Sequence, residues 1–243
     1  MDDRAIPFQG TQGVGKNAAQ PGVLYVVGTP IGNLSDLSWR AFNILSSCDC
    51  IACETPQVTQ KLLTLLNIPK KPLFTYRDAG EIQSAQHLLR KLQNQQSVAL
   101  VSDAGTPSIS DPGYRLMKIC QEQGVRVVPI PGPNAAIAAL SMAGLPTNAF
   151  LFLGFLPPKE GKIAKLFQAN QAFRGTIVLY ESPHRIQKLI LTLRKFFDTN
   201  TRIAIAHELT KLNESCYYGT LEDLDESTLS LKGEYVVLIE QGG

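Results

Sequence analysis

Four glycine- and proline-rich segments that follow apolar runs are the first candidates for a ligand site. They are residues 28–33, 103–107, 131–134 and 181–184. Glycine lets a backbone approach a ligand closely, and proline fixes the shape of a loop. Open α/β sheets bind ligands at the carboxyl ends of their strands. Because four such loops would meet at one sheet edge, the pattern favours a ligand cleft over a set of plain tight turns.

A second glycine-rich segment, residues 10–16, matches the start of a phosphate-binding loop through Lys16. Asn17 stands where that loop needs a serine or threonine to hold magnesium. No strand pattern precedes the segment, and such a loop needs a strand-to-helix turn to aim its amides. We therefore predict no phosphate site here and interpret residues 1–21 as a disordered leader.

The chain has five cysteines and no export signal, which favours reduced thiols in the cytoplasm. Cys48, Cys50 and Cys53 cluster on a predicted strand, where Cys53 would face the opposite side from the other two. No second cysteine or histidine cluster completes a zinc site, which needs four convergent ligands. We expect no bound metal.

Composition is that of an ordinary globular protein of one long domain or two shorter ones. The 243 residues are 44% hydrophobic and 18% charged, with a formal net charge of +2. That charge neither supports nor excludes a nucleic-acid partner. No apolar run approaches the roughly 20 residues of a membrane span, so no membrane association is expected.

The elements that must position the loops alternate between short apolar strands and amphipathic helices, which predicts parallel sheets with crossover helices. In a first domain, residues 22–133, we predict strands at 23–29, 50–54, 73–76, 97–102 and 126–130. The intervening helices are expected at 36–45, 58–66, 81–92 and 114–122.

A second domain, residues 134–243, is predicted to begin with a helix at 135–142 and to end differently from the first. Strands are expected at 150–155, 176–180 and 202–206, with helices at 162–171 and 184–197. The last two apolar segments, 216–220 and 234–240, have no helix between them, which indicates antiparallel strands. The sequence thus predicts an α/β protein with a mainly parallel first sheet and a mixed second sheet.

Six segments in unbroken order make the sequence resemble a known family. They are LYVVGTPIGNL, ALVSDAGTPSISDPG, VVPIPGPNAA, FLGFLPPKEGK, LYESPHR and HELTKL. Together they are similar to the bacterial small-subunit (16S) ribosomal RNA (cytidine-2′-O)-methyltransferase family of the tetrapyrrole-methylase superfamily. The resemblance runs from about residue 23 to residue 239, so it is far more specific than any single motif.

The resemblance implies a two-domain fold and S-adenosylmethionine-dependent methylation of the ribose of a decoding-centre cytidine. It also implies a cytoplasmic homodimer that acts on 16S ribosomal RNA in the small ribosomal subunit. Residues 104–107 correspond to the superfamily's Gly-Gly-Asp-Pro turn, with Thr106 replacing its aspartate. The implied cofactor-binding residues are Pro30, Asp103, Ala104, Gly105, Thr106, Ser108, Ile109, Pro133, Asn134, Ala135, Tyr180 and Leu209.

A ribose hydroxyl is a poor nucleophile at neutral pH, so general-base help of about a hundredfold would be useful. The candidates at strand ends are Glu181, which we rank first, Asp103 and Glu208. The first two could instead cap the helices that follow them. Lys211 could stabilise the developing alkoxide or bind a phosphate, although an isolated lysine in a loop is usually solvated.

A basic stretch of the second domain could follow an RNA backbone, and a solvated helix face explains it equally well. Its members are Lys159, Lys162, Lys165, Arg185 and Lys188.

The sequence departs from the family where RNA is expected. Residues 54–57 read Glu-Thr-Pro-Gln in place of Glu-Asp-Thr-Arg, residues 76–81 lack a typical histidine and asparagine, and Asn213 replaces a histidine. Residues 158–165 are also less basic. These departures leave open a non-catalytic homologue that binds RNA or ribosomes. A methyltransferase for a tetrapyrrole-type small molecule also stays open, because the superfamily shares the fold and the cofactor loops.

Overall fold

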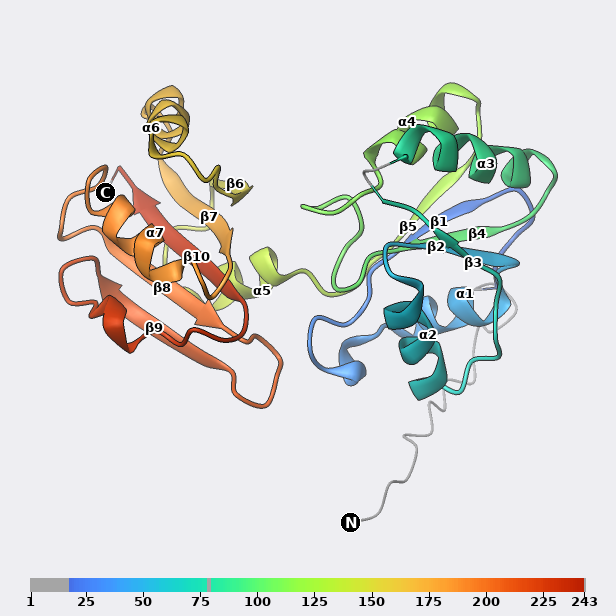
Figure 1. The fold of residues 1–243 in the computed structure, drawn as a ribbon, viewed down its shortest axis with the longest axis horizontal. Helices are drawn as coiled ribbons and strands as arrows, with labels where there is room; N and C mark the ends of the chain where they lie inside the picture. Colours follow the sequence, from blue (N-terminus) through green and yellow to red (C-terminus); the bar gives the residue numbers. More distant parts are fainter. Residues whose placement is uncertain (1–17, 78–79, 243) are drawn as a thin grey trace, which may run out of the picture. The chain divides into compact units, whose positions relative to one another are not determined.

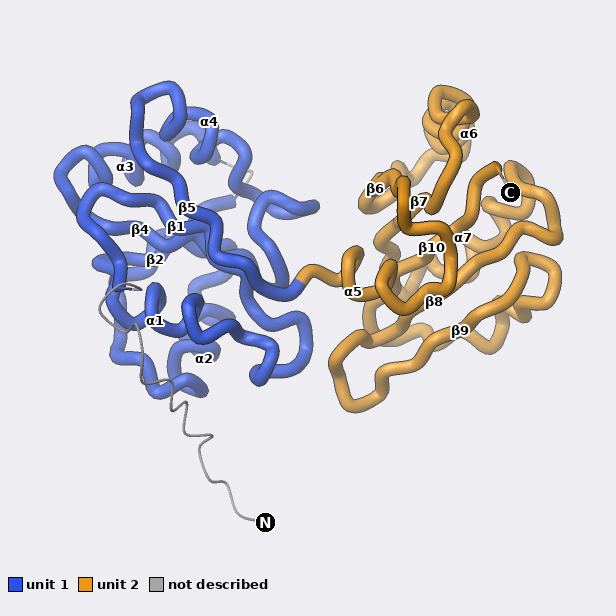
Figure 2. Tube along the Cα trace, turned by 180° about the vertical axis from the view of Figure 1, so that it is seen from behind, with its two compact units in different colours: residues 1–133 blue, residues 134–243 orange. Residues whose placement is uncertain are grey.

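The computed structural model describes residues 18–77 and 80–242, and these form two compact units. The first unit extends to Pro133 and the second begins at Asn134 (Figure 2). Most of the expected leader and the whole glycine-rich segment 10–16 lie outside the described residues. In the described part of the chain, none of the helices combines the length and the apolar character that crossing a bilayer requires.

The first unit is a five-stranded parallel sheet in the order β3-β2-β4-β1-β5 (Figure 1). Its strands are β1 (Leu24–Val27), β2 (Cys50–Cys53), β3 (Leu73–Thr75), β4 (Val98–Val101) and β5 (Val127–Ile130). Every residue of β1, β2 and β4 is buried, as expected for parallel strands covered on both faces. The sheet brings the carboxyl ends of β4, β1 and β5 side by side.

Helices cover both faces of this sheet because strand side chains alternate between two cores. Tyr25 and Val27 face α1 (Trp39–Ser47) and α2 (Pro56–Leu65). Leu24 and Leu100 face α3 (Glu81–Gln93) and α4 (Tyr114–Glu122) (Figure 1). This doubly covered sheet confirms the predicted architecture of the first unit.

The second unit is a five-stranded mixed sheet in the order β6-β7-β10-β8-β9. Its strands are β6 (Phe150–Phe155), β7 (Gly175–Glu181), β8 (Arg202–His207), β9 (Ser215–Thr220) and β10 (Tyr235–Gln241). β6 and β7 are parallel, whereas β10 is antiparallel to both β7 and β8, and β8 is antiparallel to β9. The predicted mixed sheet is confirmed.

Two helices bury one face of this second sheet, and a third packs on β7 and β10. Leu179 and Val237 belong to the core that α6 (Glu160–Ala169) and α7 (Ile186–Leu193) complete. The third helix, α5 (Ala135–Met142), begins at Asn134, whose side chain accepts a hydrogen bond from Ile137 N at 3.2 Å. This cap fixes where the chain enters the second unit.

In the second unit, the helix predicted at 184–197 is shorter, because α7 ends at Leu193 and a turn follows it. Two local predictions about the first unit were also wrong. The first helix begins at Trp39 rather than residue 36, because Ser38 caps it by accepting from Ala41 N, and residues 34–36 form a short 3₁₀ helix instead. Cys53 shares the core of Cys48, while Cys50 packs into the other one. The reason is that Cys48 ends α1 and does not lie on β2.

Candidate active site

The loops after β1 and β4 are joined by a short backbone bridge. Thr29 N donates to Gly105 O at 2.8 Å, and Gly105 N donates to Thr29 O at 3.1 Å. The buried Thr29 hydroxyl also donates to Ser102 O at 3.3 Å. Gly105 has a φ of 80°, a conformation that favours glycine. The two loops therefore hold each other at the carboxyl edge of the sheet.

The loop after β5 contacts both the β1 loop and the β4 loop. A Cβ added to Gly132 would lie 2.8 Å from Gly28 O, and one added to Gly28 would lie 2.9 Å from Gly132 Cα. The Thr106 hydroxyl donates to Pro133 O at 3.0 Å. Thr106 thus ties the β4 loop to the β5 loop.

The rest of the β4 loop follows an unusual backbone path. Ser108 and Ser110 have φ values of 73° and 64°, in the left-handed region that non-glycine residues rarely adopt. A Cβ on Gly113 would lie 2.3 Å from the Ser108 hydroxyl, so glycine is needed there. The Ile109 side chain between the two serines is 40% exposed, and Pro30 of the β1 loop is half-buried. Such outliers gather at functional sites, where the surrounding structure holds them.

Asp103 does not cap α4; it anchors the loop after β2. Its Oδ1 accepts from Thr55 N at 3.0 Å, and no cap hydrogen bond from a side chain is made at the start of α4. The exposed Arg77, which follows β3, donates through Nε to Glu54 O at 2.8 Å. Sequence reasoning missed this arginine, which stands beside the substituted segment 54–57.

In the second unit, the ends of β7 and β8 meet at one sheet edge. Glu181, the last residue of β7, is paired with Tyr235 at the start of β10. Tyr235 is paired on its other side with His207, the last residue of β8. The candidates after β7 and after β8 therefore lie about 10 Å apart across one intervening strand.

Tyr180 connects this edge to the start of α5. Its hydroxyl accepts from Ala136 N at 3.1 Å, and its ring makes edge contacts with Phe152 and Phe155 at centroid distances of 5.0 and 5.7 Å. The implied cofactor residues Asn134 and Ala135 directly precede Ala136. Tyr180 thus positions these two residues relative to the second sheet.

Glu181, ranked first as the base, is sealed inside the second unit. Its side chain is 1% exposed. One carboxylate oxygen accepts from Ser182 N at 2.8 Å, and the other lies 3.4 Å from Arg185 Nη2. Arg185 also donates to Leu156 O at 2.9 Å. Both residues are therefore engaged in holding the turn after β7, and Arg185 is less available to RNA than the exposed lysines of the same basic stretch.

Glu208 and Lys211 form a tight charged cluster on the turn after β8. Lys211 Nζ lies 2.7 Å from Glu208 Oε1 and 2.8 Å from Glu234 Oε2. Glu208 Oε1 also accepts from Glu234 N at 3.0 Å. The φ values of Glu208 and Thr210 are 52° and 65°, so this turn is strained as well. Leu209 between them is buried and fixes the turn.

The cluster sets the charge state of both groups. The hydrogen bond from Lys211 lowers the pKa of Glu208. Partial burial alone would lower the pKa of Lys211, but its hydrogen bonds to Glu208 and Glu234 raise it above the ordinary value. Lys211 is therefore an ammonium at neutral pH and can donate to a negatively charged oxygen, but it cannot serve as a base.

The structure brings the predicted residues together in two groups, each within one unit. The first unit gathers Pro30, Asp103, Ala104, Gly105, Thr106, Ser108, Ile109 and Pro133 at one sheet edge. The second gathers Tyr180, Glu181, Glu208, Leu209 and Lys211 at another, with Asn134 and Ala135 tied to it. Glu234 was missed because it lies 23 positions from Lys211 in the chain.

The cysteine cluster makes no contribution to this site. Cys48, Cys50 and Cys53 are buried, and burial raises the pKa of the Cys48 thiol to about 12. Over the described residues, no group of three or more metal-ligating side chains converges. The thiols thus behave as protonated core side chains.

Two units of this kind, with glycine-rich loops gathered at strand ends, define a two-domain α/β protein built to hold a small ligand. The family model of Tetrapyrrole (Corrin/Porphyrin) Methylases matches residues 23–225. A solved uroporphyrin-III C-methyltransferase from Thermus thermophilus, in complex with S-adenyl homocysteine, shares the fold with a TM-score of 0.61 at 17% identity. The match covers 89% of this chain and 96% of that one.

Curated relatives identify a narrower family within the tetrapyrrole methylases. Ribosomal RNA small subunit methyltransferase I of Escherichia coli O157:H7 is 43% identical over 90% of this chain and 78% of its own length. The protein of the same name from Vibrio cholerae is 45% identical over 89% of this chain and 76% of its own length. The chain therefore belongs to the tetrapyrrole methylase family and, within it, to the ribosomal RNA small subunit methyltransferase I family of methyltransferases.

Proposed function

We propose that this protein transfers the methyl group of S-adenosylmethionine to the ribose 2′-oxygen of a cytidine in small-subunit ribosomal RNA. The observation that carries the proposal is the similarity, at above 40% identity over nine-tenths of the chain, to relatives named for action on that RNA. The gathered loops of the first unit supply a site for the cofactor.

The first-unit loops suit the methionine and ribose parts of the cofactor. The bridge between Thr29 and Gly105 and the contact between Gly28 and Gly132 fix three backbones without bulky side chains. Backbone amides and carbonyls of residues 104–109 can pair with a zwitterion and with hydroxyls. When bound, the cofactor supplies an electrophilic methyl group for in-line displacement, which demands chiefly accurate positioning of the reactants.

At the acceptor, we assign Lys211 the role of stabilising negative charge that develops on the ribose oxygen. It is 31% exposed and is held by Glu208 and Glu234. A preorganised ammonium lowers the free energy of an anionic oxygen without reorganising during the reaction. Glu234, which is 75% exposed, can accept the displaced proton. Glu181 acts instead as a positioning residue through Arg185.

A homodimer in the cytoplasm completes the proposal. The second unit exposes the large apolar side chains Ile137, Met142, Phe150 and Phe155, a set that a partner copy could cover. Light scattering should give twice the 26.5 kDa mass of one chain. A monomeric mass at micromolar protein would refute this part.

The test of the activity is direct. The purified protein is incubated with radiolabelled S-adenosylmethionine and isolated small ribosomal subunits, and digested RNA is searched for a labelled 2′-O-methylcytidine. Label on that nucleoside supports the proposal. Calorimetric cofactor binding with no transfer to RNA would contradict it, and transfer to a tetrapyrrole precursor would favour the small-molecule alternative. Ribosome association without cofactor binding would favour the non-catalytic one.

A further inference from the structure

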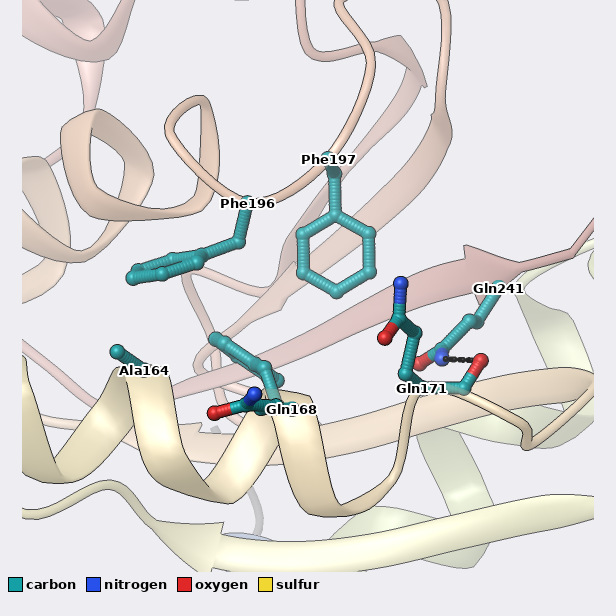
Figure 3. Close-up of a pocket in the computed structure, with 7 residues that line it drawn as sticks. Ala164, Gln168, Gln171, Phe196, Phe197 and Gln241 are labelled. Carbon is teal, nitrogen blue, oxygen red and sulfur yellow. Dashed lines mark hydrogen bonds between the residues drawn. The ribbon is translucent and has the colours of Figure 1, made fainter.

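The second unit carries a cavity that the proposed reaction does not use. It has a volume of about 320 Å³ and lies between α6, the segment after α7 and the end of β10 (Figure 3). Its lining consists of Ala164, Phe167, Gln168, Gln171, Phe196, Phe197 and Gln241. None of these side chains carries a charge, so the cavity is unsuited to an isolated phosphate or carboxylate.

Three phenylalanines form an aromatic wall. The ring of Phe167, which is buried, lies 5.5 Å from that of Phe196 and 5.2 Å from that of Phe197, measured between centroids. Phe196 and Phe197 are only half-buried, so part of their ring surface remains open. An aromatic ligand could stack on that surface.

Side-chain amides stand opposite the rings. Figure 3 shows Gln168 on α6 and Gln171 just after it, on the opposite side of the cavity from Phe196 and Phe197, with the Gln171 amide directed toward Phe197. Both glutamines are exposed, and within the described residues neither amide group makes a hydrogen bond. Gln241 is different, because its Nε2 donates to Asn170 O at 2.9 Å and to Gln171 O at 3.2 Å. Two amides with unused donors and acceptors therefore border an aromatic surface.

We propose that this cavity binds one unpaired nucleobase of the RNA substrate. A base is flat and neutral, stacks on a phenyl ring, and presents donors and acceptors at its edge that a glutamine amide can match. An acyl chain could form a hydrogen bond with neither amide. Exposed cations flank the cavity, with Lys165 one helical turn before Gln168 and Arg174 following Gln171, so the phosphates on either side of a bound base could be neutralised. The identification of the bound base as part of an RNA substrate rests on the proposed function.

Strand register places this cavity far from the candidates of the reaction in the same unit. Gln241 is paired with Gly175 at the start of β7, whereas Glu181 ends that strand. A strand of this length separates the two ends by about 20 Å. The bound base is therefore not the methylated nucleotide but one several positions away, and the cavity selects the RNA context around the target.

The test uses the full chain and a fluorescein-labelled, mixed-sequence, single-stranded oligoribonucleotide. We expect Phe196→Ala to weaken binding about tenfold, the size of one lost base–aromatic stack. The double variant Gln168→Ala/Gln171→Ala, which removes the hydrogen bonds to the edge of the base, should also weaken binding about tenfold. The control Gln123→Ala changes an exposed glutamine at the end of α4 and should bind like the wild type. Thermal unfolding confirms that each variant folds, and the glutamine double variant removes only exposed groups.

Two further measurements separate the outcomes. An oligoribonucleotide carrying 4-thiouridine should crosslink within residues 164–171 or 196–197, and an abasic oligonucleotide of equal charge should bind the wild type and the double variant alike. Unchanged affinity of the folded double variant for the base-containing probe, or a crosslink only elsewhere, overturns the inference even if the enzyme methylates ribosomal subunits. Crosslinking at the cavity without methyl transfer would instead refute the proposed function alone.

Discussion

At the scale of single residues, Lys211 is the group whose loss should separate chemistry from binding. We expect Lys211→Met to lower kcat about a hundredfold while leaving cofactor affinity unchanged, because the ammonium stabilises the oxygen anion that forms as the ribose hydroxyl loses its proton. The matched control is Lys118→Met, which removes an exposed lysine on α4. Single-turnover methylation and calorimetry give the two quantities. Equal losses in kcat and in cofactor affinity would assign Lys211 a structural role.

The Glu208 carboxyl makes stability depend on pH in a defined direction. Its pKa is lower in the folded protein, so its contribution is present above the unfolded pKa of about 4.5 and is lost as the pH falls through the folded value. The melting temperature of Glu208→Gln should therefore lie below that of the wild type at pH 7, and the difference should shrink as the pH falls below about 4.5. A constant difference across this range would contradict the pairing with Lys211.

What the sequence could predict about these residues was their place at strand ends, and not their partners. Apolar runs locate β7 and β8, so Glu181 and Glu208 could be assigned to one sheet edge. Whether a carboxylate is sealed or accessible depends on contacts distant in sequence, such as Glu234 with Lys211. The sequence shows Arg185 four positions after Glu181, which on a helix would predict an ion pair. The two residues lie instead on the turn between the end of β7 and the start of α7, so helical spacing did not predict their contact.

At the scale of elements, the contact between the β1 and β5 loops is set by two glycines. We expect Gly132→Ala to destabilise the protein by about 1–3 kcal/mol and to weaken S-adenosylmethionine binding, because the added methyl group would push the Gly28 backbone away. Gly161→Ala is the control, since a Cβ there on α6 meets nothing within 4 Å. Chemical denaturation measures the stability of both variants, and calorimetry measures their cofactor affinity. Normal cofactor affinity in a destabilised Gly132→Ala variant would show that this contact does not contribute to cofactor binding.

A second element-level link joins α3 to α4 through a buried hydroxyl. Tyr76 donates to Glu81 Oε1 at 2.8 Å and accepts from Leu116 N at 3.0 Å, and burial raises the pKa of its hydroxyl. Tyr76→Phe should cost about 1–3 kcal/mol of unfolding free energy, because the amide of Leu116 loses its partner. Tyr114→Phe, at a side chain that is 68% exposed, should cost little. Equal effects of the two changes in urea unfolding would refute the link.

Element types and sheet composition were predictable, whereas boundaries depended on capping. The buried runs of β1 and β4 and the helix-free stretch before β10 predicted one parallel and one mixed sheet. The start of α1 was predicted at residue 36, but Ser38 caps the helix, so it begins at Trp39. The close contact between the β1 and β5 loops at Gly28 and Gly132 depends on the order of the strands in the sheet. Local periodicity does not encode that order, so the contact could not be predicted from the sequence.

At the scale of the whole molecule, a formal charge of +2 means that RNA attraction must come from local clusters rather than from the net charge. Lys162 and Lys165 are exposed on α6, and neither makes an ion pair with another described residue. If they contact phosphates, the double variant Lys162→Gln/Lys165→Gln should flatten the dependence of log affinity on log salt by about 1.4, at roughly 0.7 per single-strand phosphate contact.

The matched control for this salt experiment is Lys118→Gln/Arg126→Gln, which removes the same charge from the first unit. Binding of the oligoribonucleotide is titrated at several salt concentrations with each variant and with the wild type. Because both double variants lower the net charge equally, a uniform long-range field would change their salt slopes alike. A smaller slope only for the α6 variant would place phosphate contacts on that helix, whereas equal slopes in all three proteins would identify these lysines as a solvated helix face.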